Sequence, residues 1–256
     1  MTKAHTQRTF HVEIDHISDL VVKLASHATE AVLRATQALL DGDLNEAQKV
    51  IDGDDALDSI TVTIEEKCQR LLILQQPMAI DLRTILSALW ITSELERTGD
   101  LATNICKGTR RIFGAQLTPK LRGLITEMSE EAVRLTRLGV DSFAEKDSGL
   151  AAALHDIDDR LDGLHRSFVK EIIEAGVDST LKTQAAVQLA LIARYYERIG
   201  DHAVNIGERV FYMVGGWAPE NMGAARERER RRLESMSYDL DNLSDNRDGP
   251  DESRSG

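Results

Sequence analysis

The stretch RYYERIGDHAVNI (194–206) repeats most of an earlier stretch, SELERTGDLATNI (93–105). Both contain Glu-Arg-x-Gly-Asp followed by Asn-Ile. A second match precedes each copy at similar spacing, DDALD at 54–58 and DDRLD at 158–162. Because two separate motifs recur in the same order, the chain is predicted to contain one unit duplicated in tandem.

Each unit is predicted to consist of three long helices. Prolines, which interrupt helices, occur only at Pro77, Pro119, Pro219 and Pro250, where helices should begin or where the fold has ended. Apolar residues from Leu181 to Val210 recur every three or four positions, the period of an amphipathic helix, and no segment alternates like a strand. The predicted helical segments are 10–40, 44–75, 78–113, 120–145, 149–175 and 180–214. The fold class is therefore all-α, two tandem three-helix bundles with bounds at 1–116 and 117–218.

The remainder, 219–256, is predicted to be a disordered charged tail. It begins with the block RERERRRLE (226–234) and continues as an acidic stretch rich in Ser, Asp, Asn and Gly. Such a composition offers too little apolar surface to offset the entropy of ordering the chain.

Composition limits the classes of partner. The chain has 256 residues and a formal net charge of −12, which repels phosphate backbones, so no nucleic acid partner is expected. No apolar run approaches the roughly 20 residues of a membrane span, and the N-terminus lacks an apolar signal region, so a cytoplasmic protein is expected. Cys68 and Cys106 are interpreted as small buried hydrophobic residues.

Acidic residues recur on one face of the predicted helices. Residues four apart lie one turn apart on a helix, and antiparallel neighbours bring two such columns to about the same height. Four carboxylates are thus predicted to approach one another in each unit. The candidate metal ligands are Glu96, Asp100, Asp54 and Asp58 in the first unit, and Glu197, Asp201, Asp158 and Asp162 in the second.

Neighbouring carboxylates repel one another unless a cation lies among them, and oxygen ligands suit hard metal ions. Arg97 and Arg198 offer an alternative source of positive charge. Glu197 and Asp201 point away from the main apolar stripe, toward an outer face or groove. Spacing alone therefore leaves both a metal site and solvated surface carboxylates open.

Gly99 and Gly200 interrupt helix interiors, which is unfavourable by up to about 1 kcal/mol relative to alanine. Close packing of a neighbouring helix is the favoured explanation, and room for a group at the surface is the alternative. His202, which replaces Leu101 of the first copy, is interpreted as a structural or surface residue. No phosphate-binding glycine loop or nucleophile motif occurs, so no catalytic residue is predicted.

The duplicated Glu-Arg-x-Gly-Asp-x-x-x-Asn-Ile motif, each copy closing a three-helix unit, resembles the PhoU family of bacterial phosphate-signalling regulators. The resemblance covers about 10–214. It implies metal clusters, iron or another divalent cation, bound at the bundle surface by Glu96 with Asp100 and Glu197 with Asp201. The Asp-x-x-x-Asp pairs of the preceding helices are the expected partners of these acids.

The resemblance also implies a regulatory role without catalysis. The expected function is a cytoplasmic negative regulator of the phosphate-starvation response, which links a phosphate ABC transporter ATPase to a sensor histidine kinase and modulates phosphate uptake. Such a protein would be peripheral to the inner membrane, and a homodimer is among the expected assemblies.

Two alternatives remain open from the residues alone. A helical-bundle carboxylate metal oxidase or metal-storage protein would carry inward acids and paired Glu-x-x-His motifs, whereas this chain has one such motif, Glu13 to His16. A metal-free scaffold is the other, because outward carboxylates are tolerated without a ligand.

Overall fold

The computed structural model describes residues 3–177 and 181–216, with side chains from Phe10 onward. Within these ranges the chain is helical with no strand, which confirms the predicted all-α fold. The predicted tail, 219–256, lies outside the described residues. The helices are α1 (Lys3–Asp41), α2 (Leu44–Asp52), α3 (Asp54–Gln75), α4 (Ile80–Arg111), α5 (Pro119–Glu145), α6 (Ser148–Val177) and α7 (Thr183–Gly215).

The second predicted segment, 44–75, is not continuous but breaks at Gly53 into α2 and α3. The Gly53 amide still donates to the carbonyls of Lys49 and Val50, so α2 ends on its own last turn. The stretch TVTI (61–64), although rich in β-branched residues, lies within α3 as expected. The break sets off the short helix α2 between the long helices α1 and α3 of the first half.

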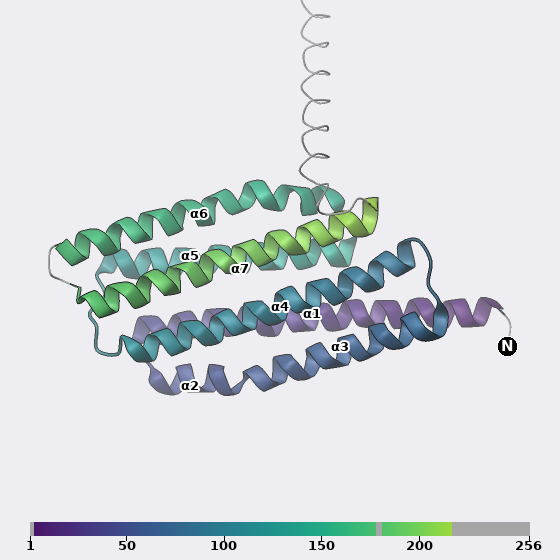
Figure 1. Cartoon of the computed structure of the whole chain (residues 1–256), viewed down its shortest axis with the longest axis horizontal. Coiled ribbons are helices and arrows are strands. Elements are labelled where there is room, and N and C mark those ends of the chain that lie inside the picture. Colours follow the sequence, from purple (N-terminus) through teal and green to yellow (C-terminus); the bar gives the residue numbers. More distant parts are fainter. Residues whose placement is uncertain (1–2, 178–180, 217–256) are drawn as a thin grey trace, which may run out of the picture. The chain divides into compact units, whose positions relative to one another are not determined.

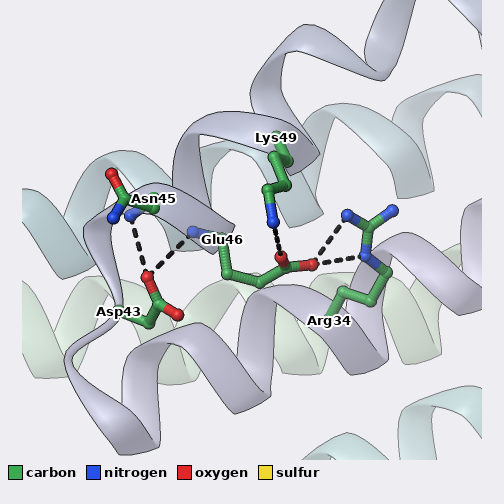
Figure 2. A network of polar contacts seen from close by, with 5 residues as sticks. All are labelled: Arg34, Asp43, Asn45, Glu46 and Lys49. Carbon is green, nitrogen blue, oxygen red and sulfur yellow. Dashed lines mark hydrogen bonds and ion pairs between the residues drawn. The ribbon is translucent and has the colours of Figure 1, made fainter.

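Side chains fix α2 at both its start and its outer face (Figure 2). The Asp43 carboxylate accepts hydrogen bonds from the amides of Asn45 and Glu46, which caps the helix. The Glu46 carboxylate accepts from Arg34 Nε of α1 at 2.7 Å and pairs with Lys49 Nζ at 3.3 Å. These contacts anchor α2 to α1.

The two halves, α1 to α4 and α5 to α7, join along two helix pairs. α4 lies beside α7, and α1 packs against α5 (Figure 1). α4 and α7 are antiparallel, because Arg83 Nε donates to the Met213 carbonyl at 3.0 Å whereas Arg111 approaches Gln188 at the far end. The halves are therefore held together over most of the length of these two helices.

The hydrophobic core continues across this junction. One cluster of buried residues includes Val32 of α1, Ile105 of α4, Met128 of α5 and Ile199 of α7. Burying apolar side chains from both halves in one cluster stabilises their association as well as each bundle.

A buried polar contact lies within this core. The Tyr196 hydroxyl of α7 is 2.7 Å from Thr36 Oγ1 of α1, which in turn lies 2.8 Å from Ser129 Oγ of α5. All three residues are buried, and burial raises the pKa of Tyr196, so its hydroxyl stays protonated. This hydrogen-bonded group therefore links α1 of the first half to α5 and α7 of the second half.

Cys68 and Cys106 are buried free thiols, as interpreted from the sequence. Burial raises the pKa of each to about 12, so the reactive thiolate is not formed at neutral pH. Across 3–177 and 181–216, none of the helices combines the length and the apolar character that crossing a bilayer requires.

Candidate functional site

The four acids predicted in the first half come together between α3 and α4. We call Asp54, Asp58, Glu96 and Asp100 the first acid cluster. Burial raises the pKa of Glu96, and the charges of Asp100, Asp58 and Asp54 raise it further, which shows that the carboxylates act on one another. Asp54 and Glu96 are half-buried, whereas Asp58 and Asp100 are exposed.

The equivalent acids of the second half come together between α6 and α7. We call Asp158, Asp162, Glu197 and Asp201 the second acid cluster. Burial, followed by the charges of Asp162 and Asp201, raises the pKa of Asp158 to about 6. Asp158 Oδ1 and Glu197 Oε2 are both buried and have no hydrogen-bond partner. Such atoms are unfavourable unless a donor or a cation reaches them.

The motif glycines bring the helices of each pair close together. A Cβ atom at Gly200 would press on Asp158 Oδ1 and lie 2.7 Å from Leu161 Cδ2. A Cβ atom at Gly99 would lie 3.1 Å from Leu57 Cδ2 and 3.7 Å from Asp54 Oδ1. The close-packing interpretation is therefore confirmed, and in each half the helix that approaches carries an acid of the cluster.

The donor chemistry of both clusters suits a hard metal ion, since each offers carboxylate oxygens at a partly desolvated helix junction. The clearest sign of a missing positive charge is the buried, unpartnered Oδ1 of Asp158, because Glu197, although its Oε2 has no hydrogen-bond partner, is already paired with Arg194 through Oε1. Within the described residues, however, no three His, Cys, Asp or Glu side chains are arranged to hold an ion. The carboxylates approach one another without closing around a common centre, and side-chain rotations would be needed to bind a metal.

Positive charge reaches the two clusters differently. Arg194 pairs with Glu197 through Nη1 and lies 3.9 Å from Asp201 Oδ2 through Nη2. Burial and the neighbouring acids raise the pKa of Glu96, and Arg97, considered from the sequence as a neutralising group, offsets only part of this rise. The ion pair of Arg97 is with Glu94, at 3.8 Å. The sequence reasoning overlooked Arg194, although it lies one turn before Glu197.

A second group that sequence reasoning missed connects the helices of the two clusters. His202 Nδ1 of α7 lies 2.6 Å from Glu94 Oε2 of α4, and Asn205 Nδ2 donates to the same oxygen at 3.2 Å. Burial raises the pKa of Glu94, but the hydrogen bonds from His202 and Asn205 outweigh it and hold the pKa below its ordinary value. Asn205, the asparagine of the second motif copy, thus contacts the opposite half.

Comparison with known proteins agrees with the duplication. A family model described as "PhoU domain" matches twice, at 21–109 and 125–210. The phosphate-specific transport system accessory protein PhoU homolog 1 of Mycobacterium tuberculosis is 35% identical over 211 residues, 82% of this chain and 95% of that protein. The PhoU homolog of Rhizobium meliloti is 30% identical over 220 residues, 86% of this chain and 93% of its own length.

Solved structures agree with the fold. The crystal structure of PhoU from Pseudomonas aeruginosa superposes with a TM-score of 0.75 at 27% identity. The superposition covers 81% of this chain and 100% of that one. The phosphate transport system regulatory protein PhoU from Streptococcus pneumoniae gives the same TM-score, with 98% of its chain covered.

Proposed function

The chain belongs to the PhoU family, and from this we propose that it acts in the cell as a negative regulator of the phosphate-starvation response. It is an accessory, regulatory protein of the phosphate-transport type and not an enzyme. In the proposed role it links a phosphate ABC transporter ATPase to a sensor histidine kinase and so modulates phosphate uptake. The names of its relatives, accessory proteins of the phosphate-specific transport system, support this placement.

The proposal includes metal binding at both acid clusters. The ion, iron or another divalent cation, would supply the positive charge that the clustered carboxylates lack. The observation that carries this part is the buried, unpartnered Oδ1 of Asp158, a carboxyl whose pKa is raised by burial and by the charges of Asp162 and Asp201. The ligands would be Asp54, Asp58, Glu96 and Asp100 in the first acid cluster and Asp158, Asp162, Glu197 and Asp201 in the second.

The proposed place of action is the cytoplasm, peripheral to the inner membrane, where transporter ATPases and kinase domains are accessible. A homodimer is part of the proposal and rests on family resemblance.

The alternative of a carboxylate metal oxidase or storage protein gains no support from the geometry. Its acids would face a bundle interior, whereas Asp58 and Asp100 are exposed. Glu13 of the single Glu-x-x-His motif pairs with Lys67 of α3 at 3.8 Å. The adaptor function is therefore the one that the site and the family support together.

A paired test separates the role of the metal from that of docking. Three proteins are recovered from phosphate-replete and phosphate-starved cells. They are the intact chain, the cluster variant with Glu96→Ala and Asp100→Ala, and a control variant. The control, Glu65→Ala with Glu66→Ala, removes two exposed acids of α3 outside the cluster. Elemental analysis measures the bound metal, and mass spectrometry identifies the partners.

We expect the intact chain and the control to retain a sensor kinase or the transporter ATPase. The cluster variant should lose about one of the two metal clusters while its circular dichroism stays helical, because these acids lie outside the core. Absence of both partners under both phosphate conditions would refute the adaptor role, and unchanged metal content in the cluster variant would refute the metal site.

A further inference from the structure

We propose that Arg194 is a built-in cation of the second acid cluster, so that the first acid cluster binds metal more tightly than the second, where the ion competes with Arg194. This inference rests on the metal binding proposed above. The duplicated motif by itself would predict two equal metal sites. Arg194 has no counterpart in the first half, so the two sites are expected to differ.

The position of Arg194 supports this role. It lies on α7 three residues before Glu197, and its guanidinium contacts both Glu197 and Asp201. Its charge also lowers the pKa of His165, after the larger effect of burial, so it acts across to α6 as well. The guanidinium therefore lies at the junction of α6 and α7, where a metal would neutralise the same carboxylates.

A second arginine adds to this difference. Arg166 Nη1 lies 4.0 Å from Asp162 Oδ2 along α6. Two arginine side chains thus approach the acids of the second cluster, one from each helix of the pair.

The first acid cluster has no such ion pair. The position that matches Arg194 in the repeated motif is Ser93, which has no charge and a short side chain. Of the ion pairs formed by the described residues, none involves Asp54, Asp58, Glu96 or Asp100. The nearest arginine, Arg97, is held by Glu94, and Lys107 acts on Asp54 only as a more distant charge.

The consequence for binding follows from charge competition. A metal ion at the second cluster must displace Arg194 from Glu197 or bind beside a like charge, whereas an ion at the first cluster displaces no paired cation. Arg194 is about half exposed, with 51% of its side chain accessible, so it has room to move away. It acts as a positioning residue that sets the order in which the clusters fill.

The test uses reciprocal exchange of the two matched residues in the full chain. Arg194→Ser makes the second cluster resemble the first, and Ser93→Arg makes the first resemble the second. Lys170→Ser is the matched control, since it removes one exposed positive charge from α6 that pairs with Glu174 and not with a cluster acid. Asp58→Asn and Asp162→Asn assign each binding event to its cluster.

The metal-free proteins are titrated with Mn²⁺ alone by calorimetry, and the bound metal is counted by elemental analysis after dialysis. We expect the unaltered chain to bind in two steps, with the weaker step lost in Asp162→Asn. Arg194→Ser should tighten that step by about two- to fivefold, the range given by one half-exposed ion pair, and Lys170→Ser should leave it unchanged. Ser93→Arg should weaken the tighter step to a similar extent.

Two equal steps in the unaltered chain, or a weaker step that Arg194→Ser does not tighten, would overturn this inference while leaving metal binding intact. Absence of any Mn²⁺ binding that depends on Asp58 or Asp162 would overturn the inference together with the metal part of the proposed function. Because Ser93 and Arg194 lie in different halves, misfolding of one variant leaves the other as an independent test.

Discussion

Glu94 and His202 meet across the junction of the two halves, with Glu94 Oε2 of α4 and His202 Nδ1 of α7 2.6 Å apart. Both side chains are largely withdrawn from solvent, at 13% and 7% exposure. The contact lies between the helices that carry the two acid clusters, and it joins one residue from each half into a polar pair, alongside the hydrogen bonds from Arg83 and Ser87 of α4 to carbonyls of α7.

Replacing His202 by leucine, the residue at the matching position of the first half, should destabilise the fold. The Glu94 carboxylate would remain buried with Asn205 as its one hydrogen-bond donor. Removing one partner of a buried pair typically lowers the free energy of unfolding by about 2 to 4 kcal/mol. Urea unfolding followed by circular dichroism measures the change. A loss below about 1 kcal/mol would show that solvent reaches Glu94.

The two motif glycines should differ in their tolerance of alanine. Gly200→Ala places a Cβ atom against Asp158 and Leu161 and should lower the free energy of unfolding by about 1 to 3 kcal/mol. Gly99→Ala meets Leu57 at 3.1 Å, a flexible side chain, and the gain in helix propensity of up to about 1 kcal/mol offsets part of the strain. Thermal unfolding of both variants tests the order. Equal losses would contradict the packing described for α6 and α7.

Tyr196→Phe removes only the hydroxyl that contacts Thr36. We expect a loss of about 1 kcal/mol in the free energy of unfolding, the usual value for a buried neutral hydrogen bond. Thr36 keeps its contacts with Val32 and Ser129, so its hydroxyl is not left unpaired. Tyr195→Phe, at the neighbouring half-buried position, is the matched control and should change stability less. A comparable loss in both variants would mean that the core contact adds nothing specific.

Asp158→Asn should stabilise the metal-free protein at neutral and alkaline pH. Because the folded-state pKa of Asp158 is raised to about 6, ionisation disfavours the folded state. This penalty is absent below the ordinary pKa of an aspartate, grows as the pH rises toward 6, and is complete above it. Since the group is partly exposed, the expected gain is about 1 kcal/mol at pH 8, vanishing near pH 4. Denaturant unfolding in a chelator across this pH range measures it. A gain that does not depend on pH would exclude ionisation of Asp158 as its cause.

Local sequence patterns predicted the helices because the signals that form them are short-range. Thr118 caps α5 with Pro119 in its first turn, and Gly216 ends α7 with φ of 77°, so the residues themselves mark these ends. The break at Gly53 was missed although the sequence Asp52-Gly53-Asp54 repeats the pattern of 41–43. The apolar positions continue through Gly53, and periodicity outweighed the local signal.

The acid clusters were predictable in membership, since spacing and antiparallel pairing fix which residues share a face. The residues that surround the acid clusters could not be predicted from the sequence. The pair formed by Glu94 and His202 joins residues from different halves, and the contact depends on how the bundles pack. The two ion pairs of Arg194 depend on its rotamer, which spacing leaves undetermined. These contacts are set by long-range packing, so the motif alone could not predict them.

The contact between Glu94 and His202 also bears on how the tandem chain evolved. The antiparallel register that pairs these two residues, and Ser87 with the Arg209 carbonyl, sets Leu101 opposite Tyr195. If two identical first halves associated in the same way, Glu94 would face Leu101, a buried acid without its imidazole. The two copies of the duplicated unit thus differ at a contact that holds them together, and two copies of the first unit packed in this register would lack the imidazole that pairs with Glu94.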